Sequence, residues 1–231
     1  RVASQLSRES GMLWSLTPPG VVELLKVFTS GTQNRARIYR VHGRNSPSKP
    51  ALIWRGRTMT WAELDERIDR FSRPLQRRGI GRKESIVLML HNRPECVELG
   101  GAAARCGAAA VTVSWRSTAK ELTYLVNHSG ARGIVIEPEL LPVLEEASPE
   151  LSDAVLSNVF VVGSSSVPSS KLKITPLDAL LEERPRDLTA DGGGDDDAAV
   201  VVYTSGATGK PKGAVRKFPK DTIQAAMRFI N

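Results

Sequence analysis

The stretch SIVLMLHNRPECVELGGAAARCGAAAVTV, residues 85–113, contains the pattern that decides the fold. It begins with a continuous apolar run of strand length, SIVLML, and ends with a second one, AAAVTV. Between them Asn92 and Pro94 mark the start of a helix that we expect to run to about Arg105, and Gly107 is a natural terminator. Strands that are apolar without alternation are buried on both faces, as in a parallel sheet covered by helices. The stretch therefore predicts a strand–helix–strand unit with parallel strands.

Strands and helices alternate on both sides of this unit. Thr60 and Glu63 have the spacing of a capping box and predict the start of a helix, which Pro74 is expected to kink. Thr118 and Glu121 repeat the capping-box spacing. The other expected elements are a helix over residues 18–28, a hairpin over 51–60, strands over 133–137, 158–163 and 198–203, helices over 138–147, 176–183 and 220–231, and surface loops over 163–171 and 184–197.

This order of elements predicts an α/β fold with a doubly wound, mostly parallel sheet and flanking helices. The 231 residues are enough for one large α/β domain or two smaller lobes. A hydrophobic content of 41% with 25% charged residues is typical of a soluble globular protein. The longest apolar runs are far shorter than the roughly 20 residues that cross a bilayer, so no transmembrane segment is predicted. The first residues do not have the pattern of a secretory signal.

The cysteines and histidines argue against disulfide and metal chemistry. Cys96 and Cys106 are ten residues apart on one predicted helix, about 15 Å along its axis, and cannot pair with each other. Such thiols are typical of a reducing compartment, so we expect a cytoplasmic location. His42, His91 and His128 are scattered along the chain and predict no metal site.

The formal net charge of +7 raises the question of a nucleic-acid partner. Basic residues gather in NRARIYRVHGRNSPSK, residues 34–49, but aromatic residues are not interspersed with them as a base-stacking platform requires. A solvated basic face is the preferred interpretation, and we expect no nucleic-acid partner. A second basic group surrounds a glycine-rich stretch and favours a small polyanionic ligand; it consists of Lys210, Lys212, Arg216, Lys217 and Lys220.

That glycine-rich stretch is VVVYTSGATGKPKG, residues 200–213, at the end of a predicted buried strand. Open α/β sheets bind ligands at the carboxyl ends of their strands. Its glycines permit successive backbone N–H groups to converge on an anion, its hydroxyls are short donors, and its lysines supply positive charge. These residues, which predict a site for nucleotide phosphates, are Thr204, Ser205, Gly206, Thr208, Gly209, Lys210, Lys212 and Gly213.

Two better-known phosphate loops do not match. A Walker A loop requires a glycine where Thr204 stands and a hydroxyl residue where Pro211 follows Lys210. The Rossmann glycine spacing fails as well, because no third glycine falls at the required place before a helix. A merely flexible turn is the remaining structural alternative, and it explains neither the lysines nor the proline.

The segment YTSGATGKPKG, residues 203–213, resembles the phosphate-loop signature of the adenylate-forming (AMP-binding) superfamily. This group contains acyl-CoA synthetases, adenylation domains of nonribosomal peptide synthetases and firefly luciferase. MTWAEL at residues 59–64 and the region 101–135 resemble upstream elements of the same superfamily, so that the resemblance covers about residues 50–216. Within it, SWRSTAKEL at residues 114–122 is closer to ligases of fatty or other carboxylic acids with CoA. One departure is Ala207, which stands where the family usually has Ser or Thr.

The resemblance implies a two-step ligation. A carboxylic acid, expected to be a fatty acid, attacks the α-phosphate of ATP to give an acyl adenylate, and CoA then displaces AMP. It implies that the β- and γ-phosphates are held by Thr204, Ser205, Gly206, Ala207, Thr208, Gly209, Lys210 and Lys212. No catalytic residue is assigned, and the ligands of Mg²⁺ are expected beyond residue 231.

The resemblance also implies how the chain is organised. We expect an N-terminal extension with a helix over residues 1–49 and the N-terminal part of the adenylation domain over residues 50–231. The C-terminal part of the same enzyme, with its catalytic lysine, is expected to follow, and the piece by itself is expected to be inactive. Two alternatives stay open: a catalytically silent nucleotide-binding or interaction module, and a basic nucleic-acid binder.

Overall fold

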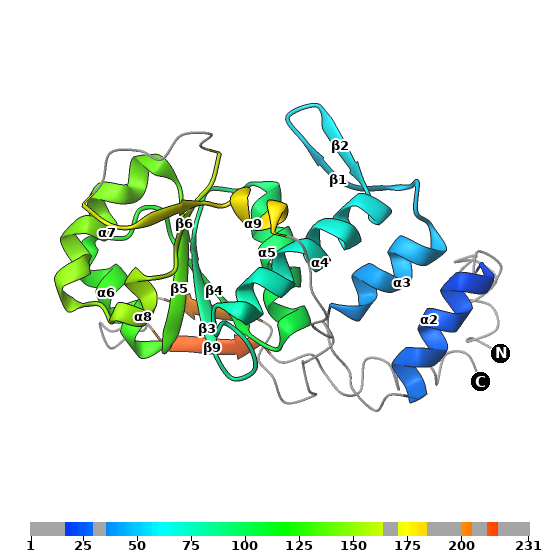
Figure 1. Ribbon diagram of the computed structural model, residues 1–231, viewed down its shortest axis with the longest axis horizontal. Coiled ribbons are helices and arrows are strands. Elements are labelled where there is room, and N and C mark those ends of the chain that lie inside the picture. The colour runs from blue at the N-terminus through cyan, green and yellow to red at the C-terminus, as the bar shows by residue number, and fades with distance from the viewer. Residues whose placement is uncertain (1–16, 30–35, 164–170, 184–199, 205–211, 217–231) are drawn as a thin grey trace.

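The computed structural model describes residues 17–29, 36–163, 171–183, 200–204 and 212–216 (Figure 1). In this part of the chain a seven-stranded sheet has the order β7-β6-β5-β3-β4-β8-β9. Each neighbouring pair from β7 to β8 is parallel, and β9 is antiparallel to β8. The strands are β3 (Ser85–Met89), β4 (Ala109–Val113), β5 (Ala131–Ile136), β6 (Val159–Val161), β7 (Ile174–Pro176), β8 (Val200–Thr204) and β9 (Lys212–Arg216).

The predicted strand–helix–strand unit is confirmed as β3, α5 (Pro94–Cys106) and β4. The two strands are parallel and in register from Ser85 opposite Ala109 to Met89 opposite Val113. Gly107 ends the helix with a φ of 82°, which places it in the left-handed region that favours glycine. All five residues of β3 are buried, as the continuous apolar run predicts.

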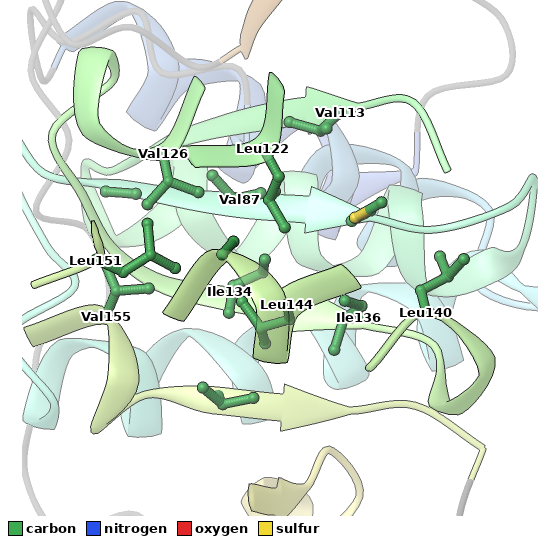
Figure 2. Packing of buried hydrophobic residues seen from close by; sticks show 14 of the residues in the cluster. Val87, Val113, Leu122, Val126, Ile134, Ile136, Leu140, Leu144, Leu151 and Val155 are labelled. Carbon is green, nitrogen blue, oxygen red and sulfur yellow. The ribbon is translucent and has the colours of Figure 1, made fainter. Parts of the chain in front are cut away.

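Helices cover both faces of the sheet, which confirms the doubly wound α/β architecture. Val87 and Met89 of β3 point into a core with α6 (Ala119–His128) and α7 (Leu141–Ala147), part of which Figure 2 shows. Ile86 and Leu88 point to the opposite face, where they pack with α4 (Trp61–Arg77), α5 and α9 (Ala179–Glu182). This division follows from the alternation of side chains along a strand.

Both predicted capping boxes are present. The carboxylate of Glu63 accepts a hydrogen bond from the backbone N–H of Thr60 at 2.7 Å, and the Thr60 hydroxyl accepts one from the backbone of Glu63 at 3.3 Å. Thr118 and Glu121 make the same pair of bonds at the start of α6. The apolar stripe of α4 is buried, and the helix continues past Pro74 to Arg77.

The N-terminal region adds helices α2 (Pro18–Thr29) and α3 (Arg37–Asn45); α3 packs beside α4, and α2 packs beside α3 (Figure 1). The first was predicted, but the second was not, because residues 34–49 were interpreted only as a solvated basic face. The ring of His42 stacks on Trp61 with centroids 4.5 Å apart, which joins α3 to α4. Strands β1 (Pro50–Trp54) and β2 (Arg57–Thr60) form the predicted hairpin, with positive φ values of 46° at Arg55 and 77° at Gly56.

Three further elements were not predicted: the short helix α8 (Asp153–Leu156) and the strands β7 and β9. The first two have only four and three residues, too few to show a period. The predicted helix over residues 220–231 and the predicted loop over 184–197 lie outside the described residues, as does most of the predicted loop over 163–171. Where the structure describes the chain, none of its helices combines the length and the apolar character that a membrane crossing requires.

Candidate functional site

The predicted phosphate loop begins and ends at the carboxyl edge of the parallel sheet. Strand β8 pairs in parallel with β4, so its last residue, Thr204, lies at the edge where β3, β4 and β5 also end. Strand β9 returns from the same place, with Lys212 opposite Thr204 and Gly213 opposite Tyr203. Residues 205–211 therefore connect two paired strand ends at the edge where α/β sheets bind ligands.

The structure places only part of the predicted site. Thr204 belongs to β8, and Lys212 and Gly213 belong to β9, a strand that the sequence analysis counted as loop. The described strands therefore extend into both ends of the segment 204–213 that was predicted as a loop. The other predicted residues lie outside the described residues; they are Ser205, Gly206, Ala207, Thr208, Gly209 and Lys210.

Two residues that the sequence analysis did not assign to a site meet at the same edge. His91 follows β3 and Glu137 follows β5, and these strands are neighbours in the sheet. The carboxylate of Glu137 accepts a hydrogen bond from the backbone N–H of His91 at 2.6 Å and lies 3.1 Å from Nδ1 of the ring. Burial opposes the ionisation of Glu137, but these bonds outweigh it and hold the pKa of the carboxyl below its ordinary value.

Aromatic and cationic groups surround this pair. Trp115, which follows β4, has its ring centroid 4.4 Å from that of His91. The guanidinium of Arg116 lies 4.2 Å from the Trp115 ring centroid, a distance typical of a cation–π contact. Arg93 lies 3.6 Å from the Glu137 carboxylate and makes two hydrogen bonds to Glu95. The edge beside β8 thus combines aromatic rings with paired charges of both signs.

His91, Glu137 and Glu139 bring ligand atoms within 4.8 Å of one another, a separation that would suit a metal ion. However, both oxygens of Glu137 lie within hydrogen-bond distance of His91, and the guanidinium of Arg93 lies 3.6 Å from the same carboxylate. A bound metal would have to displace these partners and would meet the charge of Arg93. For these reasons we assign no metal to this cluster.

The end of β8 is attached to helix α6. The hydroxyl of Tyr203 lies 2.8 Å from Nδ1 of His128, and the ring of His128 stacks on Tyr124 with centroids 5.3 Å apart. Tyr203 is only half-buried, whereas the apolar sequence of this strand predicted full burial. Its partial burial raises the pKa of the phenol, which stays protonated at neutral pH.

These residues could have been found from their positions relative to the ends of the strands. His91, Trp115 and Glu137 each lie within two residues of the end of β3, β4 or β5, and the ends of parallel strands converge at one edge. Sequence reasoning applied this rule to β8 alone because only that strand runs into a glycine-rich segment. The order of the strands, which makes β3 and β5 neighbours, is not visible in the sequence.

Comparison with known proteins agrees with this geometry. The family model described as AMP-binding enzyme matches residues 39–229. The chain is similar to the fatty acid–acyl-carrier-protein ligase ScoC of Streptomyces coeruleorubidus, with 29% identity over 75% of this chain and 31% of the relative. It is 31% identical to a 4-hydroxybenzoate–CoA/benzoate–CoA ligase of Rhodopseudomonas palustris over 77% of this chain and 32% of that protein.

A solved structure shares the fold. The anthranilate–CoA ligase AuaEII, in complex with anthranoyl-AMP, matches with a TM-score of 0.70 and 23% identity over 81% of this chain and 35% of that one. The chain spans about a third of the length of the curated relatives that it matches. Since the family model covers most of the chain, including the hairpin of β8 and β9, the chain belongs to the AMP-binding enzyme family.

Proposed function

We propose that this chain forms the phosphate-binding part of an ATP-dependent acid–thiol ligase. The enzyme would join a carboxylic acid to CoA through an acyl adenylate. The observation that supports this most is the register of the β8–β9 hairpin, which sets Thr204 opposite Lys212 at the carboxyl edge of a parallel sheet. The seven residues between them, 205–211, therefore start and finish at paired positions of one edge.

The residues of this hairpin suit a triphosphate. We propose that backbone N–H groups and short hydroxyls bind the β- and γ-phosphates, while lysine ammonium groups stabilise the charge that develops as pyrophosphate leaves. Ala207 would contribute its backbone alone. The proposed phosphate-binding residues are Thr204, Ser205, Gly206, Ala207, Thr208, Gly209, Lys210 and Lys212.

The proposal includes Mg²⁺, which would neutralise phosphate charge when it accompanies ATP, but no residue of this chain is assigned to it. The acid is proposed to be a fatty acid, and the relatives of the chain include both a fatty-acid ligase and hydroxybenzoate ligases. Domain organisation follows the sequence analysis, with residues 50–231 as the N-terminal part of the adenylation domain. A cytoplasmic location is also part of the proposal.

Titration with a fluorescent ATP analogue tests the phosphate site. We expect Lys212→Ala to weaken binding about tenfold or more, because a hydrogen bond to a charged group contributes about 1.5–3 kcal/mol. Lys49→Ala, which removes an exposed charge before β1, is the matched control and should leave the affinity unchanged. If both variants bind as the wild type does, while RNA or DNA binds in a strongly salt-dependent way, the chain is a nucleic-acid binder instead.

Ligase activity is tested separately. Thioester formation from ATP, CoA and a panel of fatty and aromatic acids measures the complete reaction. We expect the 231-residue chain to bind nucleotide and to form no thioester, because it spans about a third of the relatives' length. Thioester formation by this chain would show that our expectation of an inactive piece is wrong, although the ligase assignment would stand.

A further inference from the structure

The last turn of α6 touches the strand that leads into the phosphate loop. Tyr203, the residue before Thr204, brings its hydroxyl within 2.8 Å of Nδ1 of His128, and the two rings meet edge to face at 5.7 Å. From these contacts we propose that His128 is a positioning residue for nucleotide binding. It holds Tyr203, and through it the end of β8, in the place that the phosphate loop requires. This inference rests on the proposed function of the loop.

The hairpin itself offers Tyr203 no side-chain partner. Across the ladder Tyr203 faces Gly213, which has no side chain, so the cross-strand pair that normally stabilises a sheet is missing at this position. The contacts described for the tyrosine ring come instead from the core on the α6 side of the sheet. The last side-chain anchor that the structure describes before the loop is therefore the bond to His128.

Helix α6 is well suited to serve as the fixed support. Its start is fastened by the Thr118–Glu121 capping box, and its inner face is buried through Leu122, Leu125 and Val126. His128 is its last residue, directly before the turn at Gly130, which has a φ of 61°. The stack of Tyr124, one turn earlier, against the His128 ring fixes the direction of the imidazole. The helix side chain that touches Tyr203, His128, thus belongs to an element that the core already holds.

A purely structural role would give a different pattern from a positioning role. If the contact only stabilises the fold, its loss lowers the unfolding temperature and leaves the nucleotide affinity of the folded protein unchanged. If the contact positions β8, its loss weakens nucleotide binding even well below the unfolding temperature. The two roles therefore separate when affinity and stability are measured on the same variants.

The experiment compares four variants by titration with a fluorescent ATP analogue and by thermal unfolding. Tyr203→Phe removes only the hydroxyl, and His128→Ala removes the imidazole. Each is expected to raise the dissociation constant about two- to tenfold, the range for one hydrogen bond, and the double variant is expected to bind no more weakly than the single ones. His128→Asn keeps a polar atom at the place of Nδ1 and should restore most of the affinity.

The control is His42→Ala, which removes a stacking contact on Trp61 at the other side of the molecule and should lower stability without changing the dissociation constant. If the wild-type protein binds the nucleotide and Tyr203→Phe and His128→Ala bind it equally well, the positioning role is overturned. The proposed function of the loop would still stand. Affinity losses that His128→Asn does not reverse would also overturn the positioning role. If the wild-type chain does not bind the nucleotide, the proposed function fails, and this inference fails with it.

Discussion

The guanidinium of Arg105 is buried inside the protein, where it binds the carboxylate and the backbone carbonyl of Asp65. Only 2% of the arginine side chain is exposed. The same group lies 3.5 Å from Asp69 and donates to the carbonyl of Ala36 at 3.4 Å. One arginine thus connects α5 to α4 and to the segment that leads into α3.

Replacing Arg105 with Met should strongly destabilise the fold. The change leaves the Asp65 carboxylate without its partner in a largely buried place, and breaking a buried ion pair costs about 3–5 kcal/mol. Urea unfolding followed by circular dichroism measures this loss. The matched control is Arg132→Met, which breaks a 2.9 Å pair with Glu84 at the surface and should have little effect, since solvent screens such pairs. Equal losses in the two variants would contradict the anchoring role of Arg105.

Two adjacent glycines of α5 should respond in opposite directions to alanine. A Cβ at Gly101 would lie 2.6 Å from Cδ1 of Ile68 and 3.2 Å from the ring of Tyr39, whereas a Cβ at Gly100 would meet nothing within 4 Å. We expect Gly101→Ala to lower the free energy of unfolding by about 1–3 kcal/mol through overpacking. Gly100→Ala should raise it by about 0.5–1 kcal/mol, because alanine restricts the unfolded chain and favours the helix.

Urea unfolding of both glycine variants measures these changes in the free energy of unfolding. Stabilisation by both substitutions would mean that α4 and α5 are not packed as closely as the structure shows.

Glu137 should make stability depend on pH. Its pKa in the folded protein lies below the ordinary value of 4.5. Its contribution is therefore complete above that value and is lost as the pH falls through the lowered pKa. We expect Glu137→Gln to lower the free energy of unfolding by about 1.5–3 kcal/mol at pH 7, the range for a hydrogen bond to a charged group.

The difference between wild type and Glu137→Gln should shrink as the pH falls below 4.5. Unfolding curves at several pH values measure it, with Glu146→Gln on the exposed side of α7 as the control. A difference that is the same at low and neutral pH would show that the carboxylate charge has no part in the bond to His91.

The two thiols should react slowly and in a fixed order. Burial raises the pKa of the Cys106 thiol to about 12, and it also raises the pKa of the less buried Cys96. Because the thiolate is the reactive form, Ellman's reagent at pH 8 should modify Cys96 slowly and Cys106 only on unfolding. Cys96→Ala should abolish labelling of the native protein, and Cys106→Ala should leave it unchanged. Rapid labelling of two thiols in native protein would contradict this order.

A substitution at Ala207 is expected to strengthen nucleotide binding. It stands where the family usually has Ser or Thr, so one hydroxyl donor to phosphate is missing from the proposed loop. Ala207→Thr should tighten binding of a fluorescent ATP analogue about fivefold, since one hydrogen bond contributes about 1 kcal/mol. Ala207→Val has nearly the same shape without the hydroxyl and should give no gain. Equal affinities of the threonine and valine variants would show that this position does not face a phosphate.

Prediction from the sequence succeeded where the signal is local. The two capping boxes, the hairpin turn at Arg55 and Gly56, and the strand–helix–strand unit each depend on residues that are near one another in the chain. The same holds for strand β8, which precedes the glycine-rich segment. Helix α3 was missed because its contacts, such as the stack of His42 on Trp61, involve a distant segment.

The sequence by itself determined the class of the fold and the caps and ends of its main helices, because these follow from side-chain periodicity and backbone preference. Only the tertiary structure decided the order of the strands. That order brings Glu137 to His91 and Tyr203 to His128 across 46 and 75 positions of sequence. Such contacts depend on which strands and helices become neighbours when both faces of the sheet are buried, and no local pattern records that choice.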